Sequence, residues 1–135
     1  MKSALDVFID VVFPIIVGVA IYILFGSLHT NAISTFSWVA IYSGARIPSW
    51  VRFNLPDGLW TYSLTYSLLL IWKRSKMLSS VLFSCPSLAV SFTYEGLQLL
   101  KILPGTFSIY DILSYCVGYG SAVSLYALKN RKEHS

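Results

Sequence analysis

Charged residues are scarce in this chain. They make up 12% of its 135 residues, whereas hydrophobic residues make up 56%, and a soluble domain carries about 25% charged residues. This composition argues against a soluble domain and indicates a protein that crosses a membrane several times. The formal net charge of +4 does not change this interpretation, because the basic residues cluster between apolar runs, as topology signals do. We therefore expect no nucleic-acid partner.

Cysteine and the common catalytic motifs are scarce as well. The only cysteines, Cys85 and Cys116, differ in depth by about 10 Å or more in the topology described below, which argues against a disulfide between them. We expect both to be small buried side chains. The chain contains no serine-nucleophile elbow, phosphate loop or dinucleotide glycine motif, and it lacks the His and Cys spacing of a zinc site. The sequence thus predicts neither a bound metal nor a cofactor.

Long apolar stretches are the main feature that is present. A helix that spans a membrane needs about 20 mostly apolar residues, and four stretches qualify, at about residues 5–27, 56–72, 78–100 and 107–128. Pro56 suits the first position of the second helix, because its missing N–H is not needed there. The sequence therefore predicts an all-α fold, an integral membrane bundle of four transmembrane helices that forms a single domain over residues 1–135.

The segment between the first two stretches carries a shorter apolar run. Residues 32–45 are apolar but too few to cross a bilayer, and they include several Ser and Thr residues. We expect an interfacial or re-entrant segment here, between helices 1 and 2. A fifth span is the alternative.

Lys and Arg in the short loops set the orientation of such a bundle. Seven of the ten basic residues fall on the side of the two termini, and three fall on the other side: Arg46, Arg52 and Lys101. Both termini are therefore expected in the cytoplasm, and residues 28–55 and 101–106 are expected to face outward.

Glu95 is the residue that points most strongly to a function. A carboxylate at bilayer depth costs about 3 kcal/mol or more, so an acid inside a predicted span marks a functional site by default. Glu95 belongs to a polar stripe with the spacing of one helix face, which comprises Ser84, Ser87, Ser91, Glu95 and Gln98. In lipid such a face must contact other helices or a water-filled cavity. Glu95 is thus expected to point into the bundle near its outer end.

Two further acids fall at the same membrane level. Asp111 lies in the first turn of the fourth predicted helix and shares a face with small residues such as Gly118, which allow close helix packing. Asp57 opens the second predicted helix. A structural alternative is that Asp57 caps its helix and that Asp111 interacts with the helix dipole. Glu95 and Asp111 in one low-dielectric pocket would titrate as a pair, which suits a general acid and base or a proton relay.

Arg46 and Arg52 precede the second predicted helix on the outer side. The planar guanidinium binds phosphate and carboxylate groups through two parallel hydrogen bonds, so both are candidate ligands for an anionic headgroup. The alternative is that they anchor the chain at the membrane interface.

One stretch of the sequence resembles a known family. Glu95 and Gln98 form a Glu-x-x-Gln pair, a short loop follows, and Asp111 then precedes Gly118 by seven residues. This pattern resembles the VanZ-like family of small multi-span bacterial membrane proteins, which is named for an accessory of resistance to the glycopeptide teicoplanin. The resemblance covers about the last third of the chain, and the start of the second predicted span at Asp57 is also similar.

The chain departs from the family pattern at three places. The family often has an Arg in the loop and an Asn four residues after the Asp, where this chain has Gly105-Thr106 and Tyr115, and it often has an acid where this chain has Ser108. The resemblance implies a polar site centred on Glu95, Gln98 and Asp111 in a bacterial inner membrane. It implies no established reaction, and the departures place anion binding by a loop Arg in doubt.

Three functions remain open. The first is an outward-facing polar site that binds or processes a lipid-linked or amphipathic cell-envelope molecule, with a link to teicoplanin-type resistance implied by the resemblance. Glu95 and Asp111 would then be the acid/base pair, and the ligand-binding candidates are Gln98, Arg46, Arg52, Asp57 and Tyr115. The second is a non-enzymatic scaffold or subunit that joins a membrane protein partner or a homo-oligomer. The third is a small proton-coupled transporter.

Overall fold

The computed structural model describes residues 4–25, 48–73 and 75–133. All regular structure in these residues is helical, which confirms the predicted all-α class. The elements are α1 (Ala4–Val7), the π-helical segment η1 (Phe8–Val12), α2 (Phe13–Phe25), α3 (Ser49–Ile71), α4 (Met77–Ser84), α5 (Pro86–Leu99) and α6 (Ile109–Glu133). Two segments, Leu5–Tyr22 and Met77–Leu99, are long and apolar enough to cross a membrane. The segment predicted at residues 32–45 lies outside the described residues.

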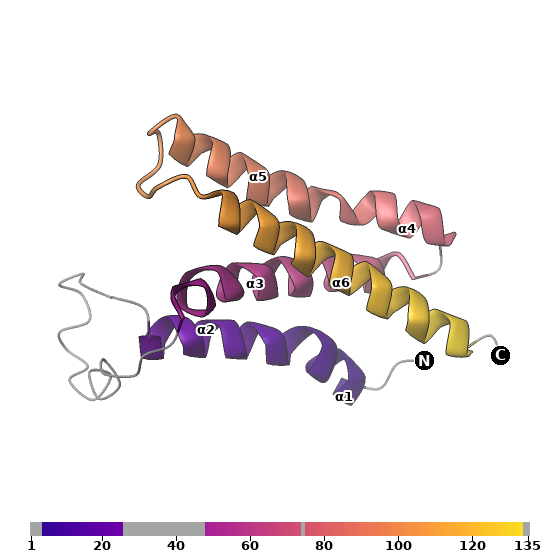
Figure 1. The fold of residues 1–135 in the computed structure, drawn as a ribbon. Helices are drawn as coiled ribbons and strands as arrows, with labels where there is room; N and C mark the ends of the chain where they lie inside the picture. The colour runs from indigo at the N-terminus through magenta and orange to yellow at the C-terminus, as the bar shows by residue number, and fades with distance from the viewer. Residues whose placement is uncertain (1–3, 26–47, 74, 134–135) are drawn as a thin grey trace.

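The helices alternate in direction along the bundle (Figure 1). The run from α1 to α2 goes one way, α3 returns, α4 and α5 go back, and α6 returns again, so α3 and α6 are parallel. The start of α1 and the end of α6 lie at one end of the bundle, and the turn between α5 and α6 lies at the other. Helices α3 and α6 form the most extensive contact between elements.

Helix α3 does not begin at Pro56, so that prediction was wrong. The helix starts at Ser49, where the carbonyl of Pro48 accepts hydrogen bonds from the N–H groups of Val51 at 3.1 Å and Arg52 at 3.3 Å. Pro56 is buried inside the helix and has no N–H to donate to the carbonyl of Arg52. A proline at such a position kinks a helix, and Figure 1 shows the first turns of α3 nearly end-on while the rest runs across the view.

The third predicted span, residues 78–100, matches the apolar helical segment Met77–Leu99, which is interrupted at Cys85, and the fourth begins and ends later than predicted. Pro86 begins α5, so Cys85 separates it from α4 and donates its N–H to the carbonyl of Leu82 at 3.2 Å. A proline cannot continue the ladder of the preceding helix, which is why the single helix predicted over residues 78–100 breaks here. Helix α6 runs from Ile109 to Glu133 rather than over residues 107–128.

Polar side chains are buried and large apolar side chains are exposed, the reverse of a soluble protein. Among the described residues the buried polar and charged set is Asp10, Thr61, Ser63, Thr65, Ser80, Ser84, Ser87 and Glu95, and the buried hydrophobic set is Tyr66, Leu69, Tyr115, Ala122 and Tyr126. Ile71 and Leu78, in contrast, are 72% and 71% exposed. The two cysteines are free, and both are exposed rather than buried as expected.

Hydroxyl groups connect the helices in the middle of the bundle. Three pairs join elements, with oxygen–oxygen distances of 2.7 Å for Thr65 and Ser87, 3.3 Å for Thr61 and Ser91, and 3.2 Å for Ser84 and Tyr119. The serine part of the predicted polar stripe is therefore used for packing against α3 and α6. Polar side chains in a low-dielectric interior need such partners, because a buried hydroxyl without one costs about 1–3 kcal/mol.

An ion pair joins the helices at the end of the bundle where α1 begins and α6 ends. Lys129 of α6 donates to both carboxylate oxygens of Asp10 in η1, at 2.6 and 2.7 Å, and the hydroxyl of Tyr66 donates to the same carboxylate at 3.0 Å. Asp10 is 4% exposed. This cluster ties the N-terminal helix to α3 and α6. Truncating one partner would be costly, because it leaves the other charge of a buried pair uncompensated.

Two glycines allow α3 and α6 to touch through their backbones. A Cβ on Gly118 would collide with the carbonyl oxygen of Gly58 and would lie 3.2 Å from the backbone nitrogen of Tyr62. A Cβ on Gly58 would lie 3.2 Å from the carbonyl oxygen of Ser114. Small residues at helix contacts permit this close approach, as the sequence predicted for the face that carries Gly118.

Gly118→Ala is expected to lower the midpoint of thermal unfolding of the purified protein, because the added Cβ must displace α3 and overpacking costs about 1–3 kcal/mol. Gly120→Ala is the matched control on the same helix, since a Cβ there has no neighbour within 4 Å. The control should raise the midpoint through a gain in helix propensity of about 1 kcal/mol. Shifts of the same sign in the two variants would contradict the backbone contact.

Candidate ligand-binding cavity

A cavity of about 820 Å³ lies at the end of the bundle where α5 turns into α6. Its walls come from α2, α3, α5 and α6 and from the turn before α6. Five of the residues singled out from the sequence line it, namely Asp57, Glu95, Gln98, Asp111 and Tyr115. Three helices thus bring three carboxyl groups to one cavity, one each from α3, α5 and α6.

Glu95 is the most deeply buried of the three acids. It is 2% exposed, and each of its oxygens accepts one hydrogen bond. The hydroxyl of Tyr115 donates to Oε1 at 3.3 Å, and the backbone N–H of Ser108 donates to Oε2 at 3.2 Å. Because a carboxylate oxygen has two lone pairs, Glu95 keeps acceptor capacity toward the cavity.

Asp111 is held by a residue that the sequence analysis missed. The side-chain amide of Asn54 donates a hydrogen bond to Oδ1 of Asp111. Asn54 was overlooked because the second helix was predicted to begin at Pro56, which placed Asn54 in a loop. Once α3 starts at Ser49, Asn54 lies three residues before Asp57 and therefore on the same helix face.

The end of α5 is closed by a left-handed residue. Lys101 has φ 57° and donates its N–H to the carbonyl of Gln98 at 2.9 Å, while Ile102 donates to Leu97 at 2.9 Å. These two bonds form the Schellman arrangement, in which glycine is the usual left-handed residue. The chain therefore turns back sharply after α5, toward the start of α6.

Gln98 fixes the turn that follows. Its amide nitrogen donates to the carbonyl of Pro104 at 3.3 Å. Gly105 has φ 133°, a backbone conformation that requires glycine, and a Cβ there would displace the amide of Gln98. This packing brings Ser108 within reach of Glu95.

Arg52, in contrast, does not line this cavity, and its role in ligand binding stays a prediction. Its guanidinium carbon lies 5.1 Å from the ring centroid of Phe53, and its Nε is buried without a hydrogen-bond partner in the described part of the chain. Arg52 precedes Asp57 by five positions, or about 140° around the helix, and therefore points elsewhere. Arg46 lies outside the described residues.

The cavity is consequently acidic and aromatic. Among the described residues no Lys or Arg lines it, and the acids Asp57, Glu95 and Asp111 form no ion pair. No group of three His, Cys, Asp or Glu side chains in the described residues is arranged to hold a metal ion. The aromatic lining comprises Tyr22, Trp50, Phe53, Tyr94, Tyr110 and Tyr115, of which only Tyr115 was predicted from the sequence to bind a ligand. Carboxylates and ring faces together attract organic cations and hydroxyl donors.

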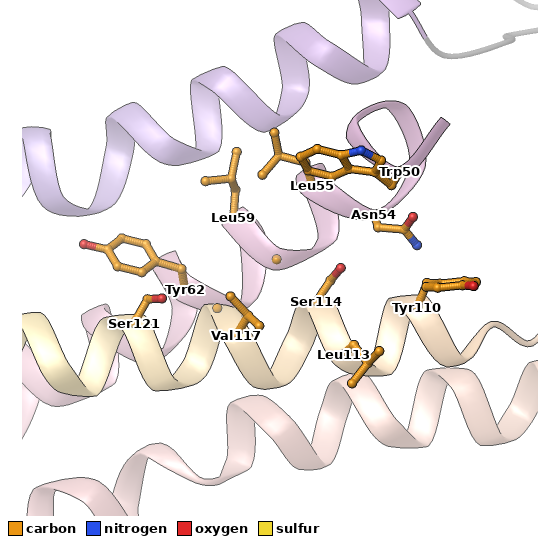
Figure 2. A pocket seen from close by; sticks show the side chains of 12 residues that line it. Trp50, Asn54, Leu55, Leu59, Tyr62, Tyr110, Leu113, Ser114, Val117 and Ser121 are labelled. Carbon is orange, nitrogen blue, oxygen red and sulfur yellow. The ribbon is translucent and has the colours of Figure 1, made fainter. Parts of the chain in front are cut away.

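An apolar groove between α3 and α6 adjoins the cavity. It has a volume of about 440 Å³ and shares Trp50, Asn54 and Tyr110 with the acidic cavity. Figure 2 shows that it runs from these three side chains at one end to Tyr62 and Ser121 at the other. The two helices approach most closely beneath the groove, at the glycines described above.

Comparison of the chain with protein-family models, with curated proteins and with solved structures finds no match.

Tyr115→Phe removes the hydroxyl that donates to Glu95 and keeps the ring. We expect it to destabilise the purified protein by about 1–3 kcal/mol in a denaturant titration, the cost of leaving a buried acceptor without its donor. Tyr110→Phe is the control, because Tyr110 lines the same cavity, is 67% exposed and makes no hydrogen bond within the described residues. Equal effects of the two substitutions would contradict a specific role for the Tyr115 hydroxyl.

Proposed function

We propose that this chain is an integral membrane protein that crosses a bacterial inner membrane four times, with both termini in the cytoplasm. The reversed distribution of polar and apolar side chains supports this proposal. The apolar segments Leu5–Tyr22 and Met77–Leu99 are only 11% and 17% buried, which is unlike the core helix of a soluble protein. The resemblance of Glu95, Gln98, Asp111 and Gly118 to the VanZ-like pattern is consistent with this location.

The proposed function is to bind the headgroup of a lipid-linked or amphipathic cell-envelope molecule at the outer side of the membrane. One observation carries it: acids from α3, α5 and α6 line a single cavity at the end of a bundle whose sides are apolar. A molecule with a polar head and a hydrocarbon part matches both surfaces. Whether the bound molecule is also altered is a separate matter, and Glu95 and Asp111 are the groups that would act as acid and base.

The charge of the cavity indicates which headgroups it accepts. Three carboxyl groups without a described cation among the lining residues repel phosphate and carboxylate and attract an amine. An ammonium group can donate three hydrogen bonds, and the open acceptor positions on Asp57, Glu95 and Asp111 can receive them. We therefore propose a headgroup that carries an amine, instead of the anionic headgroup that Arg46 and Arg52 had favoured.

The test uses two photoactivatable amphiphiles in nanodiscs, a diazirine-bearing alkylamine and the carboxylic acid of the same chain. The wild-type protein should be labelled several-fold more strongly by the amine than by the acid. Glu95→Gln and Asp111→Asn should remove this preference, because each substitution removes a carboxyl group that can pair with the ammonium of the headgroup. Labelling is quantified by intact-protein mass spectrometry.

Asp6→Asn is the control for that experiment. Asp6 is an exposed residue of α1, at the opposite end of the bundle from the cavity. It should keep the preference for the amine. If the wild-type protein shows no preference, or if Asp6→Asn removes it as fully as Glu95→Gln does, the cavity is not the headgroup site.

A second candidate function, that of a scaffold or subunit in a membrane complex, is supported by the hydroxyl pairs between helices. Thr65 with Ser87 and Thr61 with Ser91 show that polar side chains of this chain serve as contacts between helices. A scaffold would tolerate Glu95→Gln, which keeps hydrogen-bonding capacity. The labelling experiment therefore separates the two functions.

A further inference from the structure

A second cavity, of about 790 Å³, opens in the side of the bundle. It lies between α2, α3 and α5, and its wall is mostly apolar. Trp60, Leu64 and Val90 border it and are 55%, 44% and 63% exposed, so its mouth faces sideways instead of toward the end of the bundle. We refer to it as the side cleft.

The side cleft adjoins the acidic cavity. Tyr22, Asp57, Tyr94 and Tyr115 line both. A single molecule can therefore have a polar group among the acids and an apolar part in the cleft. In the membrane orientation proposed above, the mouth of the cleft faces the hydrocarbon region, from which a lipid-like molecule can enter without crossing water.

Ser63 gives the cleft a polar group without a partner. Its side chain is 1% exposed and lines the cleft, and its hydroxyl has no hydrogen-bond partner in the described part of the chain. The neighbouring hydroxyls are satisfied, since Thr65 donates to the carbonyl of Thr61 at 2.7 Å and Ser67 donates to the carbonyl of Ser63 at 2.8 Å. A buried hydroxyl left open in this way is costly, and a ligand that supplies an acceptor removes that cost.

The position of Ser63 relative to the acids limits the ligand further. Ser63 follows Asp57 by six residues in α3, which is about 9 Å along the helix axis. A ligand that fits has an amine at the acids, a hydrogen-bond acceptor such as an ester or amide carbonyl about 9 Å deeper, and a hydrocarbon chain beyond it. This is the layout of an acyl amphiphile.

We propose that the side cleft holds the hydrocarbon chain of an amine-bearing acyl amphiphile, and that the Ser63 hydroxyl donates a hydrogen bond to its ester or amide carbonyl. This inference rests on the proposed function and names its ligand class. The groove between α3 and α6 is the competing place for the chain, because it too adjoins the acidic cavity. No residue of that groove in the described part of the chain has a buried hydroxyl without a partner.

The experiment uses two size-matched substitutions, one in each apolar site. Leu64→Trp fills the mouth of the side cleft, and Leu113→Trp fills the groove between α3 and α6, where Leu113 is 54% exposed. Labelling of the nanodisc-embedded protein by the diazirine-bearing alkylamine should fall about tenfold in Leu64→Trp and stay near the wild-type level in Leu113→Trp. Peptide mapping should place the label on α2 or α5.

A second variant tests the hydrogen bond with little risk to folding. Ser63→Ala removes only the hydroxyl, and the structure shows no intramolecular bond for it to break. With a second probe, an alkylamine whose amide lies about 9 Å from its nitrogen, Ser63→Ala should weaken labelling by about three- to tenfold, the usual worth of one hydrogen bond. Labelling by the plain alkylamine should not change.

The outcomes separate this inference from the proposed function. Loss of labelling in Leu113→Trp but not in Leu64→Trp would place the chain in the other groove and overturn the inference. If labelling is retained in both Trp variants and in Ser63→Ala but lost in Glu95→Gln, headgroup binding stands. The inference that the side cleft holds the hydrocarbon chain is then again overturned. Wild-type labelling no stronger than that of Glu95→Gln would overturn the proposed function and this inference together.

Discussion

Gly118 of α6 lies so close to the backbone of Gly58 in α3 that a Cβ there would collide with it. This contact sets the register of two parallel helices, and the acidic cavity depends on that register. Asn54 lies one turn before Gly58 and Asp111 two turns before Gly118, so the same alignment brings the amide of Asn54 to the carboxylate of Asp111. A shift of one residue between the helices would rotate one of these side chains about 100° away from the other. The packing of α3 against α6 therefore also fixes the geometry of the acidic cavity.

Polar contacts join the helices of the bundle beside an apolar core cluster of Tyr66, Leu69, Ala122 and Tyr126. Hydroxyl pairs connect α5 with α3 in its middle, and the ion pair of Asp10 with Lys129 closes the end away from the cavity. In an apolar solvent this arrangement is favourable. Moving further apolar side chains out of contact with lipid chains gains no hydrophobic free energy, whereas every polar group must find a partner. Within the described residues only the hydroxyl of Ser63 and the Nε of Arg52 are buried without a partner, and of these two Ser63 lines the side cleft.

Two prolines account for most of the difference between the predicted and the observed helices. Pro56 was predicted to start a helix and Pro86 to lie within one, and the structure reverses both assignments. Helix propensity cannot decide such cases, because a proline inside a helix is tolerated where neighbouring helices hold the chain on both sides of it. The error at Pro56 also hid Asn54. The face that carries Ser84, Ser87 and Glu95 was predicted correctly, since a spacing of three and four residues survives the interruption at Cys85.

The sequence by itself determined the helical class, the apolar character of the helix exteriors and the inward direction of Glu95, because these follow from composition and from a period of 3.6 residues, both of which are local. Tertiary structure alone decided that Asp57, Glu95 and Asp111 share one cavity, that Arg52 is not part of it, and that Tyr115 donates to Glu95. These facts depend on where α3 bends and on how it meets α6. They include contacts between residues as far apart in the sequence as Asn54 and Asp111. Such contacts are set by helix packing and are not encoded in any local pattern.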